Sequence, residues 1–137
     1  MVRVVRPTPA GLAVCARWPD HAYQWHREGF DLPPGSELLA EGDMFPVQAF
    51  RHGPCAYGIQ FHPEVTHAMM CRWTGRGHKR MAQPGAKQRA AHFADRAVHD
   101  FAIRAWLSDF LDLWTGHAHA DIRAAAGSRE HTLAAAT

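Results

Sequence analysis

A histidine and a glutamate stand two residues apart in the segment 60–64, separated by a proline. A carboxylate can accept a hydrogen bond from one imidazole nitrogen and fix the tautomer, so that the other nitrogen acts as a general base. In a strand, residues two apart point to the same side, and Pro63 marks a strand end because proline has no N–H to donate. The spacing therefore predicts that His62 and Glu64 leave the carboxyl end of a strand together, where the ligand crevices of α/β folds lie.

His-Pro-Glu by itself is a short motif, and it also fits a strand that ends at proline with two solvated side chains. The surrounding sequence predicts the elements that hold it. Short apolar runs predict strands at 2–5 and 12–16, and an aromatic strand over 22–26 would deliver Trp25 and His26 to its end. A further strand is expected at 36–40. Strand-type residues at 47–51 and 57–62, on either side of a Gly/Pro turn, predict a hairpin.

Helical spacing follows the hairpin. Val65, Met69 and Trp73 fall in register and predict a short helix that stops at the glycines near residue 75. The composition of residues 74–90 is typical of a mobile surface loop with few contacts. The strongest helix is expected over 95–114, with one face packed on a sheet. That face is predicted to carry the apolar residues Val98, Phe101, Ala102, Ala105, Trp106, Phe110 and Leu113.

The run 57–65 closely resembles the signature of class I (triad-type) glutamine amidotransferase domains such as those of GMP synthase. The segments 25–35, 39–40 and 48–51 are similar to that family's preceding blocks, in the same order. The resemblance extends from near residue 1 to about residue 73, and the helix from Trp106 to Trp114 looks like the terminal helix of some members. It implies an α/β fold, the C-terminal portion of a flavodoxin-like class I amidotransferase domain. We expect this partial domain over 1–116, followed by a flexible tail over 117–137.

By that resemblance, His62 would be the catalytic base and Glu64 its orienting acid in a Cys-His-Glu triad. Such a triad hydrolyses the glutamine side-chain amide through a thioester and releases ammonia to an acceptor, with no cofactor. The family's nucleophile lies on a Gly-x-Cys-x-Gly elbow between a strand and a helix, and this sequence contains none. The chain is thus expected to be truncated or to begin past the elbow, and to be inactive alone. The alternative is a non-catalytic remnant or binding module of the same fold.

The three cysteines offer no clear substitute for that nucleophile. Cys55 follows a Gly-Pro pair, but a strand is expected after it, whereas a nucleophile needs a helix N-terminus to lower its pKa. Cys15 and Cys71 lack flanking glycines and are interpreted as inert thiols. An odd number of cysteines without an export signal favours reduced thiols over disulfides.

Two further groups of residues have alternative interpretations. Trp25 and His26 either pack under the Pro33-Pro34 loop or line the crevice near an acceptor channel. The segment His117-Ala-His119-Ala-Asp121 has metal-ligand types, but we expect a solvated tail there and no metal. A metal-dependent hydrolase using these histidines is the remote alternative.

Composition limits the remaining classes of function. The 137 residues suffice for one domain, and no apolar run is long enough to cross a bilayer or to serve as a signal peptide. A cytoplasmic location without membrane contact is therefore expected. A net charge of +2 with scattered arginines does not indicate a nucleic-acid partner. The expected partners are glutamine and a complementary half-domain, or a second copy through an exposed strand edge.

Overall fold

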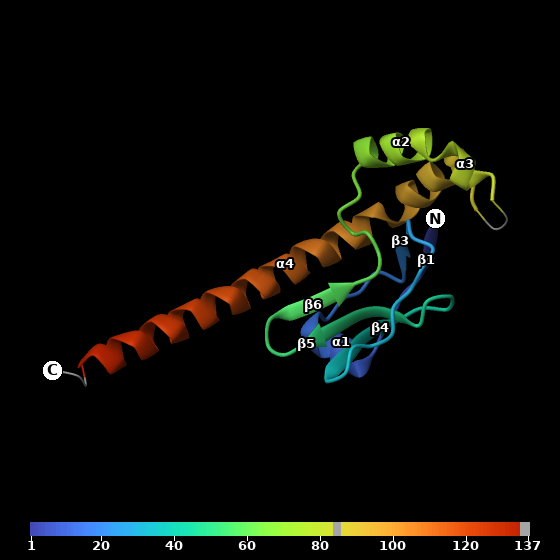
Figure 1. The fold of residues 1–137 in the computed structure, drawn as a ribbon. Helices are drawn as coiled ribbons and strands as arrows, with labels where there is room; N and C mark the ends of the chain where they lie inside the picture. Colours follow the sequence, from blue (N-terminus) through green and yellow to red (C-terminus); the bar gives the residue numbers. More distant parts are fainter. Residues whose placement is uncertain (84–85, 135–137) are drawn as a thin grey trace.

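The computed structural model describes residues 1–83 and 86–134, except for the side chains of residues 78, 80 and 117–134. Short strands, with one short helix among them, precede two helices and one long terminal helix (Figure 1). The elements are β1 (Val2–Val4), β2 (Arg6–Pro7), α1 (Pro9–Val14), β3 (His21–Tyr23), β4 (Ser36–Glu41), β5 (Val47–His52), β6 (Ala56–Ile59), α2 (His67–Arg76), α3 (His78–Met81) and α4 (Arg89–Ala134).

Two antiparallel sheets make up the β structure. One is four-stranded in the order β2-β4-β5-β6, and the other pairs β1 with β3. The hairpin between β5 and β6 turns through Gly53, whose φ of 61° suits glycine. The predicted hairpin and the strand at 36–40 are therefore confirmed.

Helix α4 runs along the sheets and continues beyond them (Figure 1). Its buried residue Trp106 is 1% exposed and contacts Phe61 and Phe110 through their rings, with centroids 5.1 Å apart in each case. Val5 and Leu39 of the sheet region are also buried in this group, which we call the Trp106 cluster. Burying such side chains contributes about 1.5–3 kcal/mol each to folding, so this cluster is the main hydrophobic core.

The prediction of a strand at 12–16 is wrong, because residues Pro9–Val14 form helix α1. The Thr8 hydroxyl caps this helix by accepting the Gly11 N–H at 3.1 Å, and Pro9 occupies the first turn, where it has no N–H to lose. Gly11 also allows a close approach, since a Cβ there would lie 2.0 Å from the Leu39 carbonyl oxygen. The Thr-Pro start signal in the sequence thus outweighs the short apolar run.

The prediction of a mobile loop over 74–90 is also wrong for the residues of this segment that the structure describes. Helix α2 continues to Arg76 and ends at Gly77, as the glycines predicted, but α3 follows directly. Met81 in α3 is buried, and Lys87 forms an ion pair with Asp95 at 2.7 Å. The charged and glycine-rich composition of this segment therefore did not show that it packs against the start of α4.

The predicted packing face of the long helix is only partly correct. Trp106 and Phe110 are buried as expected, but Val98 is 74% exposed and Phe101 is 86% exposed. Ile103 takes the inward position instead. The helix carries two apolar stripes, and spacing alone could not show which one faces the sheet.

The structure also extends α4 through Ala134, past the residue at which the flexible tail was expected to begin. This segment is rich in alanine, the residue with the highest helix propensity. An absent apolar stripe argues against packing, but it does not argue against helix formation. The boundary of the domain at residue 116 remains a prediction.

Candidate functional site

His62 and Glu64 lie in a turn just after β6, and not on the strand itself. The strand ends at Ile59, three residues earlier than predicted. One more ladder bond forms, from Gln60 N–H to the Gln48 carbonyl at 2.8 Å. The His62 N–H then donates to the Tyr23 carbonyl at 2.8 Å, so the segment leaves β5 and joins the end of β3.

The predicted contact between the two side chains is present even though its origin differs. His62 Nδ1 donates to Glu64 Oε1 at 2.9 Å, because a carboxylate can only accept. The turn at Pro63 brings the side chains together, where the strand alternation had been expected to do so. The His62 side chain is 31% exposed and that of Glu64 is 50% exposed. This arrangement fixes the tautomer and leaves Nε2 as the basic nitrogen.

An aromatic cluster packs against the His62 ring. Trp73 of α2 meets the His62 ring edge-to-face, with centroids 5.2 Å apart. Trp73 in turn packs on Trp25 and on Tyr23, with ring centroids 5.8 Å and 6.4 Å apart. These three rings, with Val65, Met70 and Phe93, form what we call the Tyr23 cluster. In the sequence, Trp73 is evident only as part of an apolar helix face.

A hydrogen bond in the Tyr23 cluster also escaped the sequence analysis. The Tyr23 hydroxyl lies 3.1 Å from His92 Nδ1, and His92 Nε2 lies 3.1 Å from the Lys87 carbonyl. Since the carbonyl can only accept, Nε2 carries the proton and Nδ1 accepts from tyrosine. Burial raises the pKa of Tyr23 and lowers the pKa of His92, which keeps both groups neutral.

A chain of hydrogen-bonded amide side chains links His26 to Gln48 of β5. The Phe45 carbonyl accepts from Gln48 Nε2 at 2.9 Å, and Gln48 Oε1 accepts from Gln24 Nε2 at 2.6 Å. Gln24 Oε1 therefore faces His26 Nε2, while His26 Nδ1 faces the Glu28 carbonyl at 2.9 Å. Both ring nitrogens face acceptors, so only the protonated ring could donate to both.

Burial acts against that protonated form. It is the main cause that lowers the pKa of His26, and the nearby His62 lowers it further, while the bond to the Glu28 carbonyl raises it. The same carbonyl also accepts from Gln60 Nε2 at 3.0 Å. Residues 24–28 and 60–62 are thus joined side by side, which brings together two of the blocks on which the family resemblance depends.

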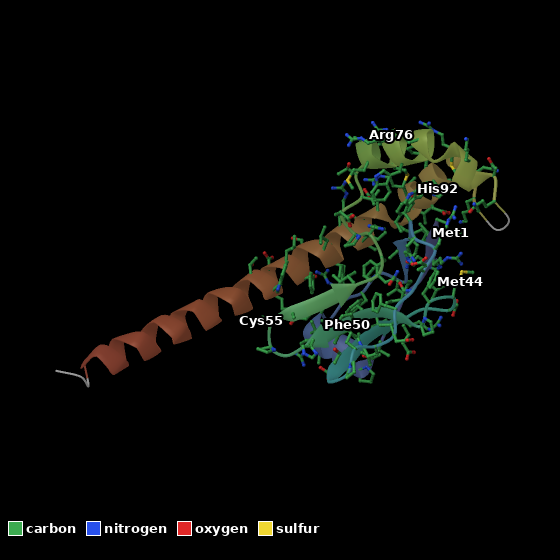
Figure 2. All side chains as sticks on the ribbon, in the orientation of Figure 1. Met1, Met44, Phe50, Cys55, Arg76 and His92 are labelled. Carbon is green, nitrogen blue, oxygen red and sulfur yellow. The ribbon has the colours of Figure 1, made fainter. Side chains whose placement is uncertain are left out.

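Trp25 and His26 both border a cavity with a volume of about 900 Å³. Met44, Phe45 and His92 are also among its lining residues. Figure 2 shows Met44, Met1 and His92 on the same side of the molecule. His62 and Glu64 do not line this cavity. The hydrogen-bonded pair has the geometry of an imidazole oriented by a carboxylate, and its catalytic role is still a prediction.

None of the cysteines has the surroundings of a nucleophile elbow. Cys55 lies in the turn before β6, at the end of the sheet far from His92 (Figure 2), and its carbonyl accepts from the Trp114 indole at 2.9 Å. Cys15 follows α1, where burial raises the pKa of its thiol. Cys71 is inside α2. Not one of the three stands between a strand and the start of a helix.

The described residues offer no metal site. No group of three or more histidine, cysteine or carboxylate side chains among them could hold a metal ion. The side chains of His117, His119 and Asp121 lie outside the described ones. Over the same part of the chain, no helix has both the length and the apolar character that crossing a membrane requires.

Solved structures identify the fold as that of class I glutamine amidotransferases. A glutamine amidotransferase from Methylobacillus flagellatus superposes with a TM-score of 0.75 at 20% identity, over 85% of this chain and 51% of its own. One from Thermotoga maritima gives a TM-score of 0.67 at 22% identity, over 81% of this chain and 48% of its own. The predicted α/β class and its flavodoxin-like amidotransferase form are therefore confirmed.

In sequence, the chain is similar to the glutamine-hydrolysing GMP synthases. It is 53% identical over 38 residues to a GMP synthase subunit from Thermococcus kodakarensis, which is 27% of this chain and 20% of that protein. It is 38% identical over 63 residues to the GMP synthase of Marinobacter nauticus, which is 45% of this chain and 11% of that enzyme. No family model matches. The chain thus matches about a fifth of the Thermococcus protein and about half of the solved amidotransferases.

Proposed function

We propose that this chain supplies the base and the orienting acid of a glutamine amidotransferase site. The observation that carries the proposal is the 2.9 Å hydrogen bond from His62 Nδ1 to Glu64 Oε1. It is supported by the packing of Trp73 against His62 and by the similarity to GMP synthases. Trp25 and His26, which border the adjoining cavity, would line the path between this site and an ammonia acceptor.

The residues define the proton transfers. His62 Nε2 would accept the proton of a cysteine thiol while the thiolate attacks the glutamine side-chain carbonyl. The same nitrogen would return the proton to the departing amide nitrogen, so that ammonia leaves and a thioester remains. Water, deprotonated by His62, would then cleave the thioester to glutamate and restore the thiol. Glu64 would hold the imidazole orientation and stabilise its charged form.

The nucleophile must come from elsewhere, since residues 1–137 contain no Gly-x-Cys-x-Gly. A complementary half-domain that carries the elbow would complete the site. We therefore expect the 137-residue chain alone to release no ammonia from glutamine above buffer. Turnover by the chain alone that disappears in Cys55→Ala would contradict this and make the hairpin cysteine the nucleophile.

The decisive experiment restores an elbow-bearing half and measures ammonia release. His62→Ala is expected to abolish most of the activity, because no other group moves the proton. Glu64→Gln is expected to lose only part of it, because an orienting residue costs less to remove. Glu37→Gln, a carboxylate paired with Arg51 on the sheet, is the matched control. Full activity in both His62→Ala and Glu64→Gln would reject the assignment.

A non-catalytic binding module of the same fold remains the second candidate. The placement of all three cysteines outside an elbow favours it. The two candidates separate in the same experiment, because a binding module would bind the complementary half without gaining glutaminase activity.

A further inference from the structure

One edge of the β1–β3 sheet has no strand beside it among the described residues. Met1 and Gln24 exchange backbone hydrogen bonds, and Val5 N–H donates to the Asp20 carbonyl at 2.9 Å. In an antiparallel pair the bonded positions alternate, so Arg3 bonds inward to β3, whereas the N–H and C=O groups of Val2 and Val4 point away from it. Within the described part of the chain, the Val2 N–H has only the Asp95 carboxylate, at 3.4 Å. This edge can therefore accept another strand.

The long helix has an uncovered apolar flank. Val98 and Phe101 are its most exposed large apolar residues among the described side chains, and Ala94 and Ala102 beside them are exposed as well. At 100° per residue these four positions fall on one side of the helix. We call this surface the Phe101 flank. Together its members form a contiguous apolar strip of the kind that marks an interaction surface.

The Phe101 flank lies on the same side of α4 as the open strand edge. The opposite flank is covered by the α2 region, since Phe93 packs on His67 at 5.1 Å and Arg96 donates to the Val65 carbonyl. Asp95, which binds the Val2 N–H, stands next to the Phe101 flank on the helical wheel. The edge of β1 and the Phe101 flank are consequently neighbours, and one partner can cover both.

Cavities beside β1 extend this surface. The cavity of about 900 Å³ and a smaller one of about 190 Å³ both border Arg3. The smaller one also borders Val2 and Val4. A partner that pairs with β1 would therefore also close these two hollows.

We propose that β1 and the Phe101 flank together form the docking surface for a strand-and-helix unit, the complementary half of an amidotransferase domain. A strand satisfies the outward groups of Val4 and the outward carbonyl of Val2, whose N–H is bonded to Asp95, and a helix covers Val98 and Phe101. The solved amidotransferases support this occupant, because each shares the fold of this chain and contains about as much chain again. The naming of the partner as the nucleophile-bearing half rests on the proposed function; the surface itself does not.

The test mixes the full chain with the amino-terminal half of the Methylobacillus flagellatus amidotransferase as a separate polypeptide. Sedimentation velocity is expected to show a one-to-one complex, and hydrogen exchange at the Val4 amide should slow on mixing. Phe101→Glu and Val98→Glu should each weaken binding by about tenfold or more, as expected for buried apolar anchors. Val4→Pro should weaken it too, because it removes an outward N–H without breaking the pairing with β3.

Leu111→Glu is the matched control, since Leu111 is an exposed apolar residue of α4 at 40% and falls on the opposite flank. It should bind normally, with circular dichroism confirming the fold of every variant. His62→Ala should bind normally and yet lack glutaminase activity, which separates docking from function. Undiminished binding by Phe101→Glu, absence of any complex, or self-association of the chain through Phe101 in its place would each overturn the proposal.

Discussion

The Trp106 cluster and the Tyr23 cluster use similar aromatic residues for different purposes. In the Trp106 cluster the contacts are apolar, and Trp106 Nε1 has no hydrogen-bond partner among the described residues. In the Tyr23 cluster the ring of Trp73 is half-buried and the polar Tyr23 hydroxyl is bonded to His92. The first cluster has the features of a hydrophobic core. The second packs Trp73 against His62 and contains a satisfied polar pair, and satisfied polar networks specify geometry.

The sharpest test of this contrast is Trp106→Ala. Removing the buried indole should lower the free energy of unfolding by about 3–5 kcal/mol, as large-to-small core substitutions do. Trp106→Phe should cost much less, because a ring remains and the unpaired N–H disappears. Urea denaturation measures both. A loss below about 1 kcal/mol for Trp106→Ala would show that the core lies elsewhere.

Tyr23→Phe tests the second cluster at nearly constant volume. It leaves His92 Nδ1 without its donor in a buried position, which should cost about 1–3 kcal/mol. His92→Leu in the Tyr23→Phe background should cost less than His92→Leu alone, since the two groups are coupled. Additive effects in this double-mutant cycle would mean that the bond contributes nothing.

Acid should weaken the Tyr23 side of the molecule in particular. Burial lowers the pKa of His26, His92 and His99 below the ordinary value of about 6.5. Below about pH 6.5 the unfolded chain binds protons at these histidines and the folded chain does not. The free energy of unfolding is therefore highest above that pH and declines as the pH falls toward the lowered pKa values. The melting temperature should thus decrease between about pH 7 and about pH 5. His92→Gln should flatten the decline, and a level profile in the parent chain would refute it.

The smallest effect is expected at the rim of the Trp106 cluster. Arg17 and Asp109 form an ion pair at 2.9 Å, but their side chains are 77% and 42% exposed. Exposed pairs contribute about 0–1 kcal/mol, so Arg17→Ala should change the free energy of unfolding by less than about 0.5 kcal/mol. A larger change that vanished in high salt would indicate that charge, and not apolar burial alone, holds α4 on the sheet.

Local sequence was sufficient for several elements and for the pairing of the site residues. The Gly-Pro turn predicted the hairpin because glycine tolerates the positive φ found at Gly53. The glycine at residue 77 ended α2 as expected. His62 and Glu64 are two residues apart, so a strand or a turn brings them close, and the prediction of their contact survived the early end of β6.

Only the tertiary structure decided which parts of the chain support that pair. His92 is 30 residues from His62, just beyond a segment expected to be a loop, and no local pattern links it to Tyr23. The apolar positions of α4 repeat on two flanks, and helical spacing cannot choose between them. The choice is made by the sheet that receives Trp106 and leaves Phe101 exposed, because burial depends on contacts between segments distant in sequence.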